Sequence, residues 1–439
     1  MTNFNHKIQL RFYPVLVIFL LLVLAYSPYY IYNYLMVKFL DGGNIRALFG
    51  LASACSFFIL IFFHTYRKKI TFSKNVYLFI FVFLYLWLVA LLSAFLGRDF
   101  FYIAYELYPM LEGLLFFMIG YYLVAIGFKK EMMASLLLFC AVNVFFDLFI
   151  TLYYYAFNFN FAYVVDVGGI LVNRIPDSML PVYLAISLVM SKYYNYGQLK
   201  YIAHLLVVVT LILLLISFWR TLMISGFIVL LFYIYKHKKY FLTKKSILYL
   251  FLLTLSILPV SIIVEGSTGM SIELLSSERM SSAFDENKSR SIGSRILDSK
   301  VVLLQILQSP IIGNGFGGLY SDLSGSHYYL SSTSNYLLRL IAHFGLLVSS
   351  IMFFGVYYFF RNMQKFSRHL TLKNNIEGAS SLALLQLLNY VSLSTGIILI
   401  AFPSVLHYPL LLILFMLFGA VVQDKKNYKI NGNNITKTK

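Results

Sequence analysis

Long stretches without any Asp, Glu, Lys or Arg recur along the chain, and polar residues gather in the segments between them. The runs 78–97 and 201–218 are two examples. Each matches the roughly 20 residues that a helix needs to cross the hydrocarbon core of a bilayer. Lipid offers the backbone no hydrogen-bond partners, so a spanning segment must be helical. The pattern therefore predicts an all-α, polytopic membrane protein with about twelve spans, at roughly 12–35, 45–65, 76–97, 109–127, 131–155, 178–191, 201–217, 221–235, 246–264, 334–360, 379–400 and 404–423.

The longest polar stretch, 265–333, separates the ninth predicted span from the tenth and is expected to form one large loop. Within it, apolar residues recur at helical spacing over 295–308, with Leu297, Val301 and Leu304 on one face. This spacing predicts an amphipathic helix that lies along the membrane surface. Residues 1–423 are expected to form a single membrane domain. The lysine-rich segment 424–439 is expected to be a basic tail without regular structure.

The composition supports the membrane interpretation. Hydrophobic residues make up 60% of the chain and charged residues only 12%, which excludes an ordinary soluble domain. The two cysteines, Cys55 and Cys140, fall inside predicted spans, so we expect buried thiols and neither a disulfide nor a metal site. The first apolar run extends to about Val37, which is longer than the core of a signal peptide, and we expect an uncleaved first span.

The cations set the expected orientation. Most lysines fall in alternate segments between the predicted spans, and cytoplasmic segments of membrane proteins are enriched in Lys and Arg. Both termini are therefore predicted to face the cytoplasm, with the 265–333 loop outside, in the cytoplasmic membrane. The net charge of +18 follows from this bias and from attraction to anionic membrane lipid, and does not argue for a nucleic-acid partner.

Arginine, in contrast, predominates among the cations placed outside or within the membrane. This group includes Arg98, Arg174, Arg220, Arg290, Arg295 and Arg339. A guanidinium presents a planar fork that can grip phosphate or carboxylate through two hydrogen bonds, which an ammonium does less well. The alternative is that single arginines snorkel to the interface or pair with outer acids. Arg220 is also suited to anchor the chain beside Trp219.

Two more patterns lie on either side of the loop's end. Asn335, Arg339 and His343 recur every four residues, so they share one face of the tenth span and should face the protein interior or a water-filled cavity. His343 also fits a hydrogen-bonded packing role. Residues 313–318 formally match GxGxxG, but no βαβ unit surrounds them, and the match indicates a tight turn whose amides could help to hold an anion.

The order of four motifs resembles the superfamily of O-antigen ligases and Wzy-type O-antigen or capsular polysaccharide polymerases. The motifs are the Ser-x-x-Arg-Thr junction at Ser217 to Thr221, the Ser-Arg helix start at Ser294, the Ser-Pro-x-x-Gly-x-Gly turn from Ser309, and the stretch from Asn335 to Gly345. The resemblance covers roughly residues 205–360 and extends to the rest in hydropathy only. Ligases typically carry His-Asn where this chain has Ser334 and Asn335, which favours a polymerase.

The resemblance implies an inverting, metal-independent glycosyl transfer between lipid-diphosphate-linked glycans outside the membrane. We expect the growing glycan to move from undecaprenyl diphosphate to another lipid-linked repeat unit. Arg220 and Arg295 would hold the diphosphate with support from Arg290, and the remaining candidate substrate-binding residues are Asn335, Arg339 and Arg174. The candidate bases are His327 and Asp322, with Glu278 as an open rival.

No metal or other cofactor is expected, because the outer loops contain no Asp-x-Asp or Glu-x-Asp pair and arginines would neutralise the ligand charge. A chain-length regulator is a further candidate partner. Two alternatives remain: a ligase-type glycosyltransferase and a transporter of lipid-linked glycans. A transporter of two six-span halves should have its long link inside, between spans six and seven, whereas the long link here lies outside, between spans nine and ten.

Overall fold

The computed structural model describes residues 11–31, 74–157, 164–167, 170–173, 179–193, 197–217, 220–241, 260–266, 268–271, 277, 290–317, 319–321, 327–329, 336–372, 376–401 and 408–437. Among these residues, four helices are long and apolar enough to cross a membrane: Lys129–Phe157, Leu199–Ile216, Leu338–Arg368 and Ala379–Ile398. Such lengths and compositions are those of a helical membrane protein. The predicted span at 45–65 and most of the one at 246–264 lie outside the described residues.

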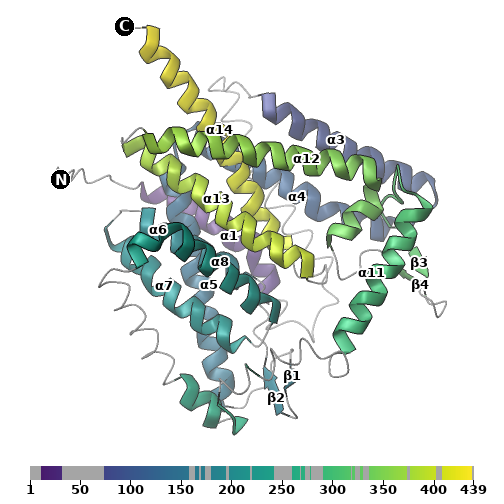
Figure 1. Ribbon diagram of the computed structural model, residues 1–439, viewed down its shortest axis with the longest axis horizontal. Coiled ribbons are helices and arrows are strands. Elements are labelled where there is room, and N and C mark those ends of the chain that lie inside the picture. Colours follow the sequence, from purple (N-terminus) through teal and green to yellow (C-terminus); the bar gives the residue numbers. More distant parts are fainter. Residues whose placement is uncertain are drawn as a thin grey trace.

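Eleven helices in the described part of the chain are arranged as Figure 1 shows, and all but α11 overlap a predicted span. They are α1 (Phe12–Ile31), α3 (Lys74–Phe95), α4 (Phe100–Ala125), α5 (Lys129–Phe157), α6 (Leu180–Tyr193), α7 (Gly197–Ile216), α8 (Arg220–Phe241), α11 (Arg290–Gln308), α12 (Tyr336–Leu372), α13 (Ile376–Ala401) and α14 (Tyr408–Lys437). Figure 1 shows α11 at one edge of the molecule, next to one end of α12.

Two short antiparallel hairpins modify the all-α prediction. Strand β1 (Val164–Val167) pairs with β2 (Ile170–Asn173), and β3 (Leu319–Ser321) pairs with β4 (His327–Tyr329). Both hairpins lie in segments that the sequence places outside the membrane. Strands of three or four residues are too short to produce a period-two pattern that stands out from a loop, so the sequence did not indicate them.

Helix α6 forms the centre of the bundle although it is the shortest of the predicted spans. Every residue from Leu180 to Ser191 is buried. The helix packs against α5, α7, α8 and α13, so protein rather than lipid surrounds it. A helix that is apolar on all sides is suited to such a position, because it has no polar face to present to water. The same core contains Cys140, which is buried as predicted, while Cys55 lies outside the described residues.

Helices α4 and α14 cross at very close range through two glycines. A Cβ added at Gly120 would lie 1.8 Å from the Met416 carbonyl oxygen, and one added at Gly419 would lie 1.9 Å from the Phe117 carbonyl oxygen. Small residues at a crossing let two backbones approach, and in lipid the resulting packing is the main source of association between helices. The crossing therefore fixes the last helix of the chain on α4.

We expect Gly120→Ala to destabilise the fold by about 1–3 kcal/mol, because the new methyl group would overlap backbone that cannot rotate away. A lower melting temperature of the detergent-purified protein would show this. Gly396→Ala is the matched control, since a Cβ at this helical glycine meets nothing within 4 Å. Equal melting temperatures for the two variants would contradict the close crossing.

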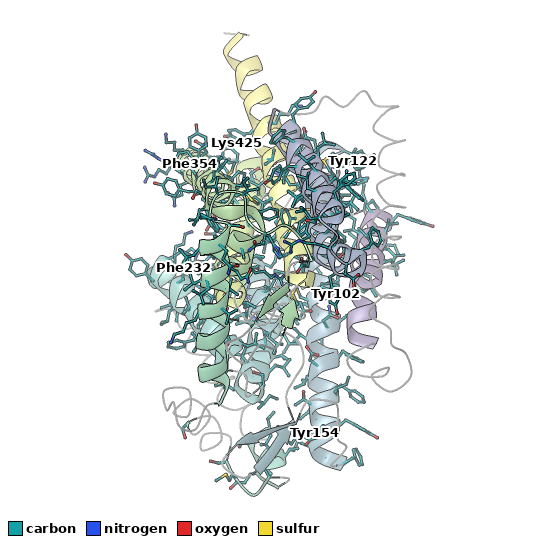
Figure 2. The ribbon with its side chains drawn as sticks, turned by 90° about the vertical axis from the view of Figure 1, so that its right-hand side faces the viewer. Tyr102, Tyr122, Tyr154, Phe232, Phe354 and Lys425 are labelled. Atoms are coloured by element: carbon teal, nitrogen blue, oxygen red, sulfur yellow. The ribbon has the colours of Figure 1, made fainter. Side chains whose placement is uncertain are left out.

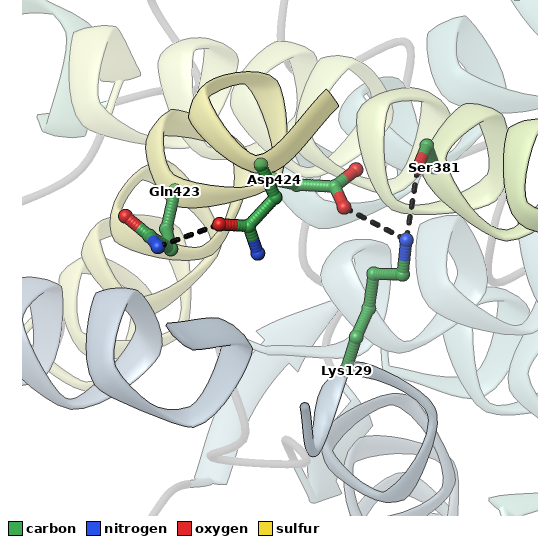
Figure 3. Close-up of polar contacts among 5 residues, drawn as sticks. Lys129, Ser381, Gln423 and Asp424 are labelled. Carbon is green, nitrogen blue, oxygen red and sulfur yellow. Dashed lines mark hydrogen bonds and ion pairs between the residues drawn. The ribbon is translucent and has the colours of Figure 1, made fainter. Parts of the chain in front are cut away.

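An ion pair joins three helices at one end of the bundle (Figure 3). The Lys129 ammonium, at the first residue of α5, donates to Asp424 Oδ1 on α14 over 2.7 Å and to Ser381 Oγ on α13 over 2.8 Å. On α14 itself, Gln423 Nε2 donates to Asn427 Oδ1 over 2.9 Å. Both charged side chains are largely shielded from solvent, so the contact is screened less than a surface pair. The start of α5 is thereby tied to the first turns of α13 and to the middle of α14.

The C-terminal segment differs from its prediction. Residues from Asp424 onward were expected to lack regular structure, whereas α14 continues without a break to Lys437. The earlier turns of α14 are anchored on α4, and a helix that is already nucleated adds further residues at little cost. The polar composition of 424–437 therefore marks the point where the helix leaves the apolar core and not the point where it ends.

The outer faces of several helices expose large apolar side chains. Phe354 on α12 is 68% exposed, and Figure 2 shows it on the periphery of the bundle. Phe81 and Leu84 on α3 are 66% and 60% exposed. Exposed apolar surface of this extent would be unfavourable in water, whereas it is the ordinary surface of a helix that contacts lipid.

Candidate functional site

Helix α12 is interrupted close to its start, and the candidate site is built around this break. Gly345 has φ 72° and ψ 170°, which is neither helical nor readily adopted by a residue with a side chain. A break leaves the last carbonyls of the first helical piece and the first amides of the second without their usual partners. At membrane depth these groups must be satisfied by other parts of the protein.

The segment 310–315 supplies these partners from its own backbone. Asn314 N–H donates to the Ala342 carbonyl over 2.6 Å, and Gly315 N–H donates to the His343 carbonyl over 3.0 Å. In the other direction, Leu346 N–H donates to the Pro310 carbonyl over 2.7 Å. The glycine-rich segment that the sequence assigned to a tight turn therefore docks into the break of α12. We call the resulting cluster of the turn, the break and the side chains around them the turn site.

A buried acid and a buried histidine face each other in the turn site. Glu106 on α4 is 3% exposed and His343 on α12 is 1% exposed. His343 Nδ1 lies 2.7 Å from the Gly315 carbonyl oxygen, which can only accept, so Nδ1 carries a hydrogen. His343 Nε2 lies 3.7 Å from Glu106 Oε1. The other carboxylate oxygen, Oε2, accepts from Gly317 N–H over 2.6 Å.

Glu106 and His343 are close enough to interact electrostatically. Within the described part of the chain, neither His343 Nε2 nor Glu106 Oε1 has a hydrogen-bond partner. Their separation of 3.7 Å lies within the range of an ion pair and beyond that of a hydrogen bond. Burial of either polar group without the other would be costly, so Glu106 and His343 act as a unit.

Two arginines lie close to the pair of Glu106 and His343. Arg339 lies one helical turn before His343 and is 3% exposed, which confirms that this face of α12 points into the protein. Arg98 lies in the turn between α3 and α4, and both arginines act electrostatically on His343. Burial lowers the pKa of Arg98, and the negative charge of Glu106 opposes this shift. The turn site therefore places two guanidinium groups beside the acid and the imidazole.

The turn is also anchored on α3 and α4. Phe316 N–H donates to Ser93 Oγ over 2.9 Å, and Ser93 in turn donates to the Val89 carbonyl within α3 over 2.8 Å. The Phe316 ring is completely buried and meets the ring of Phe344 edge to face, with their centroids 5.6 Å apart. The turn site therefore joins α3, α4 and α12 by hydrogen bonds and by an aromatic plug.

Helix α11 leads directly into the turn and rests on the first piece of α12. Val301, Val302 and Ile306 are buried against α12, in one cluster with Ala342. Asn314 Nδ2 also donates to the Gln305 carbonyl over 3.3 Å. The predicted amphipathic helix is therefore confirmed, although it begins at Arg290 and ends at Gln308. Its location along the membrane surface stays a prediction.

The predicted apolar face of α11 is partly wrong. Val301 is buried as expected, but Leu304 is 53% exposed, and Val302 and Ile306 occupy the packed face in its place. The helix is apolar over more than one face in its second half, so spacing alone did not identify the side that packs. Leu303 and Leu307, at 47% and 72% exposure, extend the exposed apolar strip. Such a strip is suited to contact lipid or a lipid-like substrate.

The structure brings together only part of the predicted site. Arg339 lies in the turn site, whereas Arg220 begins α8, Arg290 begins α11 and Arg295 lies in the second turn of α11. The side chains of these three arginines lie outside the described part of the structure, so their common pocket stays a prediction. His327 pairs with Ser321 across the β3–β4 hairpin, and its side chain is likewise not described. Asp322, Asn335 and Arg174 lie outside the described residues.

Sequence reasoning missed Glu106 and Ser93 as members of the site. The fourth span was predicted to begin at 109, whereas α4 begins at Phe100, so Glu106 was taken for a residue of the loop. An acid within the apolar stretch 100–125 was the available signal, because an intramembrane carboxylate is rare and usually has a function or a partner. Nothing in the sequence indicated Ser93, since its role depends on a backbone amide far away in the chain.

No three His, Cys, Asp or Glu side chains gather to form a metal site within the residues that the structure describes. The turn site instead offers guanidinium groups and an imidazole, which suit the binding of an anion and the positioning of a loop. No family model, no curated protein and no solved structure matches this chain.

Proposed function

We propose that the chain is a polysaccharide repeat-unit polymerase of the cytoplasmic membrane. It would transfer a glycan from undecaprenyl diphosphate to a second lipid-linked repeat unit at the outer face. The proposal includes about twelve spans with both termini in the cytoplasm. The observation that carries it is the turn site, a buried cluster with two arginines that fixes an arginine-bearing helix, α11, on a membrane span.

Contacts between predicted cytoplasmic residues support the orientation. Lys129 and Asp424 were both assigned to the inside and lie 2.7 Å apart, although 295 positions separate them in the chain. Lys192 Nζ and His237 Nδ1, at the ends of two other predicted spans, lie 2.5 Å apart. Figure 2 shows Lys425 and Tyr154 near opposite ends of the bundle, with Tyr154 beside the β1–β2 hairpin. This separation agrees with an outer hairpin and an inner C-terminus.

The fixed position of α11 and of the turn after it supports a catalytic role for the predicted outer loop, 265–333. A glycosyl transfer that releases a diphosphate is accelerated by donors that are already in place when negative charge develops. Helix α11 is held on α12 by apolar packing, and its exit is held by backbone hydrogen bonds in the break. Arg290 and Arg295 therefore lie on a fixed element and not on a free loop, as a preorganised site requires.

In the proposed reaction, an acceptor hydroxyl attacks the anomeric carbon from the face opposite the diphosphate. The bond between this carbon and the diphosphate oxygen breaks as the new glycosidic bond forms, so the configuration is inverted. The acceptor proton passes to a base, for which His327 and Asp322 are the candidates. Arg220, Arg295 and Arg290 hold the departing diphosphate, and Arg339, Asn335 and Arg174 are the further candidate residues for substrate binding.

One observation favours the transporter alternative. Interrupted helices such as α12 are a recurring feature of transporter binding sites, where the free backbone groups of the break contact the substrate. Here, however, the turn already occupies the groups at Ala342, His343 and Leu346. Purified protein given labelled lipid-linked repeat units would distinguish the two. Polymer formed without a transmembrane gradient indicates a polymerase, transfer of glycan to a different lipid acceptor indicates a ligase, and movement without new bonds indicates a transporter.

Substitution of Arg295 tests the proposed site directly. We expect Arg295→Ala to reduce polymer formation by about 10²-fold, because a donor aimed at the leaving diphosphate is lost. Arg295→Lys should retain part of the activity, since it keeps the charge and loses the fork. Lys300→Ala is the matched control, because this exposed cation lies on the same helix. The measurement is the polymer ladder at equal protein levels, and a normal ladder for Arg295→Ala would reject the assignment.

A further inference from the structure

A second cluster of cations, apart from the turn site, lies where α6, α8 and α13 meet. Lys192 is in the last turn of α6, and Lys236 and His237 follow one another on α8. All three lie just beyond the predicted spans 178–191 and 221–235. His237 is 7% exposed, and the helix departs from helical geometry at this residue, with φ −122° and ψ 24°. We call these residues and Gln386 on α13 the inner cluster.

The hydrogen bonds of the inner cluster assign its protons. Lys192 Nζ lies 2.5 Å from His237 Nδ1, and an ammonium can only donate, so Nδ1 is the acceptor. The hydrogen of the neutral ring is then on Nε2, which is buried and has no hydrogen-bond partner among the described residues. Lys236 Nζ donates to Gln386 Oε1 and keeps further hydrogens to donate. Lys236 and the Nε2 hydrogen of His237 therefore remain as hydrogen-bond donors in the inner cluster.

The charges of the inner cluster repel one another. Burial and the charges of Lys192 and Lys236 lower the pKa of His237 to about 4, so its ring is neutral at physiological pH. Burial and the charge of Lys236 lower the pKa of Lys192 to about 8. Aromatic rings add only weak compensation, with Lys236 Nζ 5.6 Å from the ring centres of Phe232 and Tyr390. An anion beside these groups would relieve the repulsion and could accept a hydrogen bond from His237 Nε2.

From these observations we infer that the inner cluster is a binding site for a phosphate group, to which Lys192 and Lys236 contribute positive charge and His237 Nε2 contributes a hydrogen-bond donor. Phosphate offers several strong acceptor oxygens and the negative charge that two ammonium groups require. A basic pocket between membrane helices on the cytoplasmic side is the usual setting for a phospholipid headgroup. A soluble phosphate presents the same chemistry. This site lies apart from the proposed polymerase site and does not depend on it.

Lipid and phosphate titrations of the full-length protein test the site. Protein in detergent is given phosphatidylglycerol, phosphatidylcholine or inorganic phosphate, and melting temperature and lipid retention in native mass spectrometry are recorded. We expect phosphatidylglycerol to be retained and to raise the melting temperature, with little effect of phosphatidylcholine. An equal effect of inorganic phosphate would identify a soluble ligand. No effect of either phosphate source would overturn the inference.

Variants separate this site from general attraction to anionic lipid. Lys236→Gln should weaken phosphatidylglycerol binding about tenfold or more, because one charge-assisted hydrogen bond is lost. Lys236 is the exposed member of the cluster, so the variant should fold normally. His237→Gln tests the ring donor in the same way. Lys365→Gln is the matched control, since it removes an exposed cation from the same side of the protein. Equal binding by Lys236→Gln and Lys365→Gln would also overturn the inference.

Discussion

Replacing Glu106 by alanine is expected to destabilise the protein by about 3–5 kcal/mol, which is typical when one member of a buried charge pair is removed. His343 Nε2 would then face an empty space, and Gly317 N–H would lose its acceptor. Arg98 and Arg339 would also keep their positive charges in a buried site without the neighbouring carboxylate. A fall in melting temperature and in the yield of monodisperse protein would show the effect.

Two further variants separate charge from hydrogen bonding at this position. Glu106→Gln keeps an oxygen that can accept from Gly317 N–H but removes the negative charge, so its effect should lie between wild type and Glu106→Ala. The double variant Glu106→Leu/His343→Leu should be less destabilised than the sum of its single variants, because neither charge is left alone. Glu265→Ala, at an exposed acid, serves as the control. Wild-type stability of Glu106→Ala would show that the carboxylate is not part of a coupled pair.

Replacing Gly345 by alanine is expected to separate the turn from the break in α12. The φ of +72° costs a residue with a side chain about 1–2 kcal/mol. The new Cβ would also lie 2.1 Å from the Ile311 carbonyl oxygen, so the turn would have to move. Carbonyls of Ala342 and His343 would then lose their partners at membrane depth, at about 1–3 kcal/mol for each unsatisfied group. We expect a large fall in melting temperature and loss of polymer.

A control variant distinguishes the clash of the new Cβ with Ile311 from the strain of the positive φ at position 345. Gly127→Ala is the matched control, because Gly127 has φ +86° and a Cβ there meets nothing within 4 Å. Both variants carry the strain of a positive φ, and only Gly345→Ala displaces the turn. Melting temperatures of the two proteins and polymer ladders at equal protein levels are the measurements. Similar losses for both variants would mean that the docked turn contributes little to the fold or to the activity.

Much of the helical framework could be predicted because each element depends on local composition. The predicted span 76–97 became α3, Lys74–Phe95, and the predicted span 131–155 became α5, Lys129–Phe157. The four-residue spacing of Arg339 and His343 correctly predicted that both side chains point into the protein. These predictions succeeded because it is costly to place charges or unpaired backbone groups in lipid. A segment in lipid must therefore be helical, and its charged side chains must point into the protein.

The candidate site depended instead on contacts between distant parts of the chain. Glu106 acquires its role from His343 and from the amide of Gly317, and no local pattern records that pairing. The break at Gly345 was equally hidden, because glycine is tolerated in membrane helices and only the docked turn makes the break necessary. The proximity of Lys192 and His237 also required the fold. Local patterns therefore predicted the framework and the tertiary contacts defined the sites.

The crossing of α4 and α14 has a consequence for biosynthesis. Gly120 emerges from the ribosome well before Met416, its partner at the crossing. The surface of α4 around Gly120 therefore stays uncovered while the helices between α4 and α14 are inserted. This part of the bundle closes only when α14 is inserted, and a nascent chain that stops before Tyr408 leaves the surface of α4 uncovered. Quality-control proteases of the membrane would find such truncated chains incompletely packed.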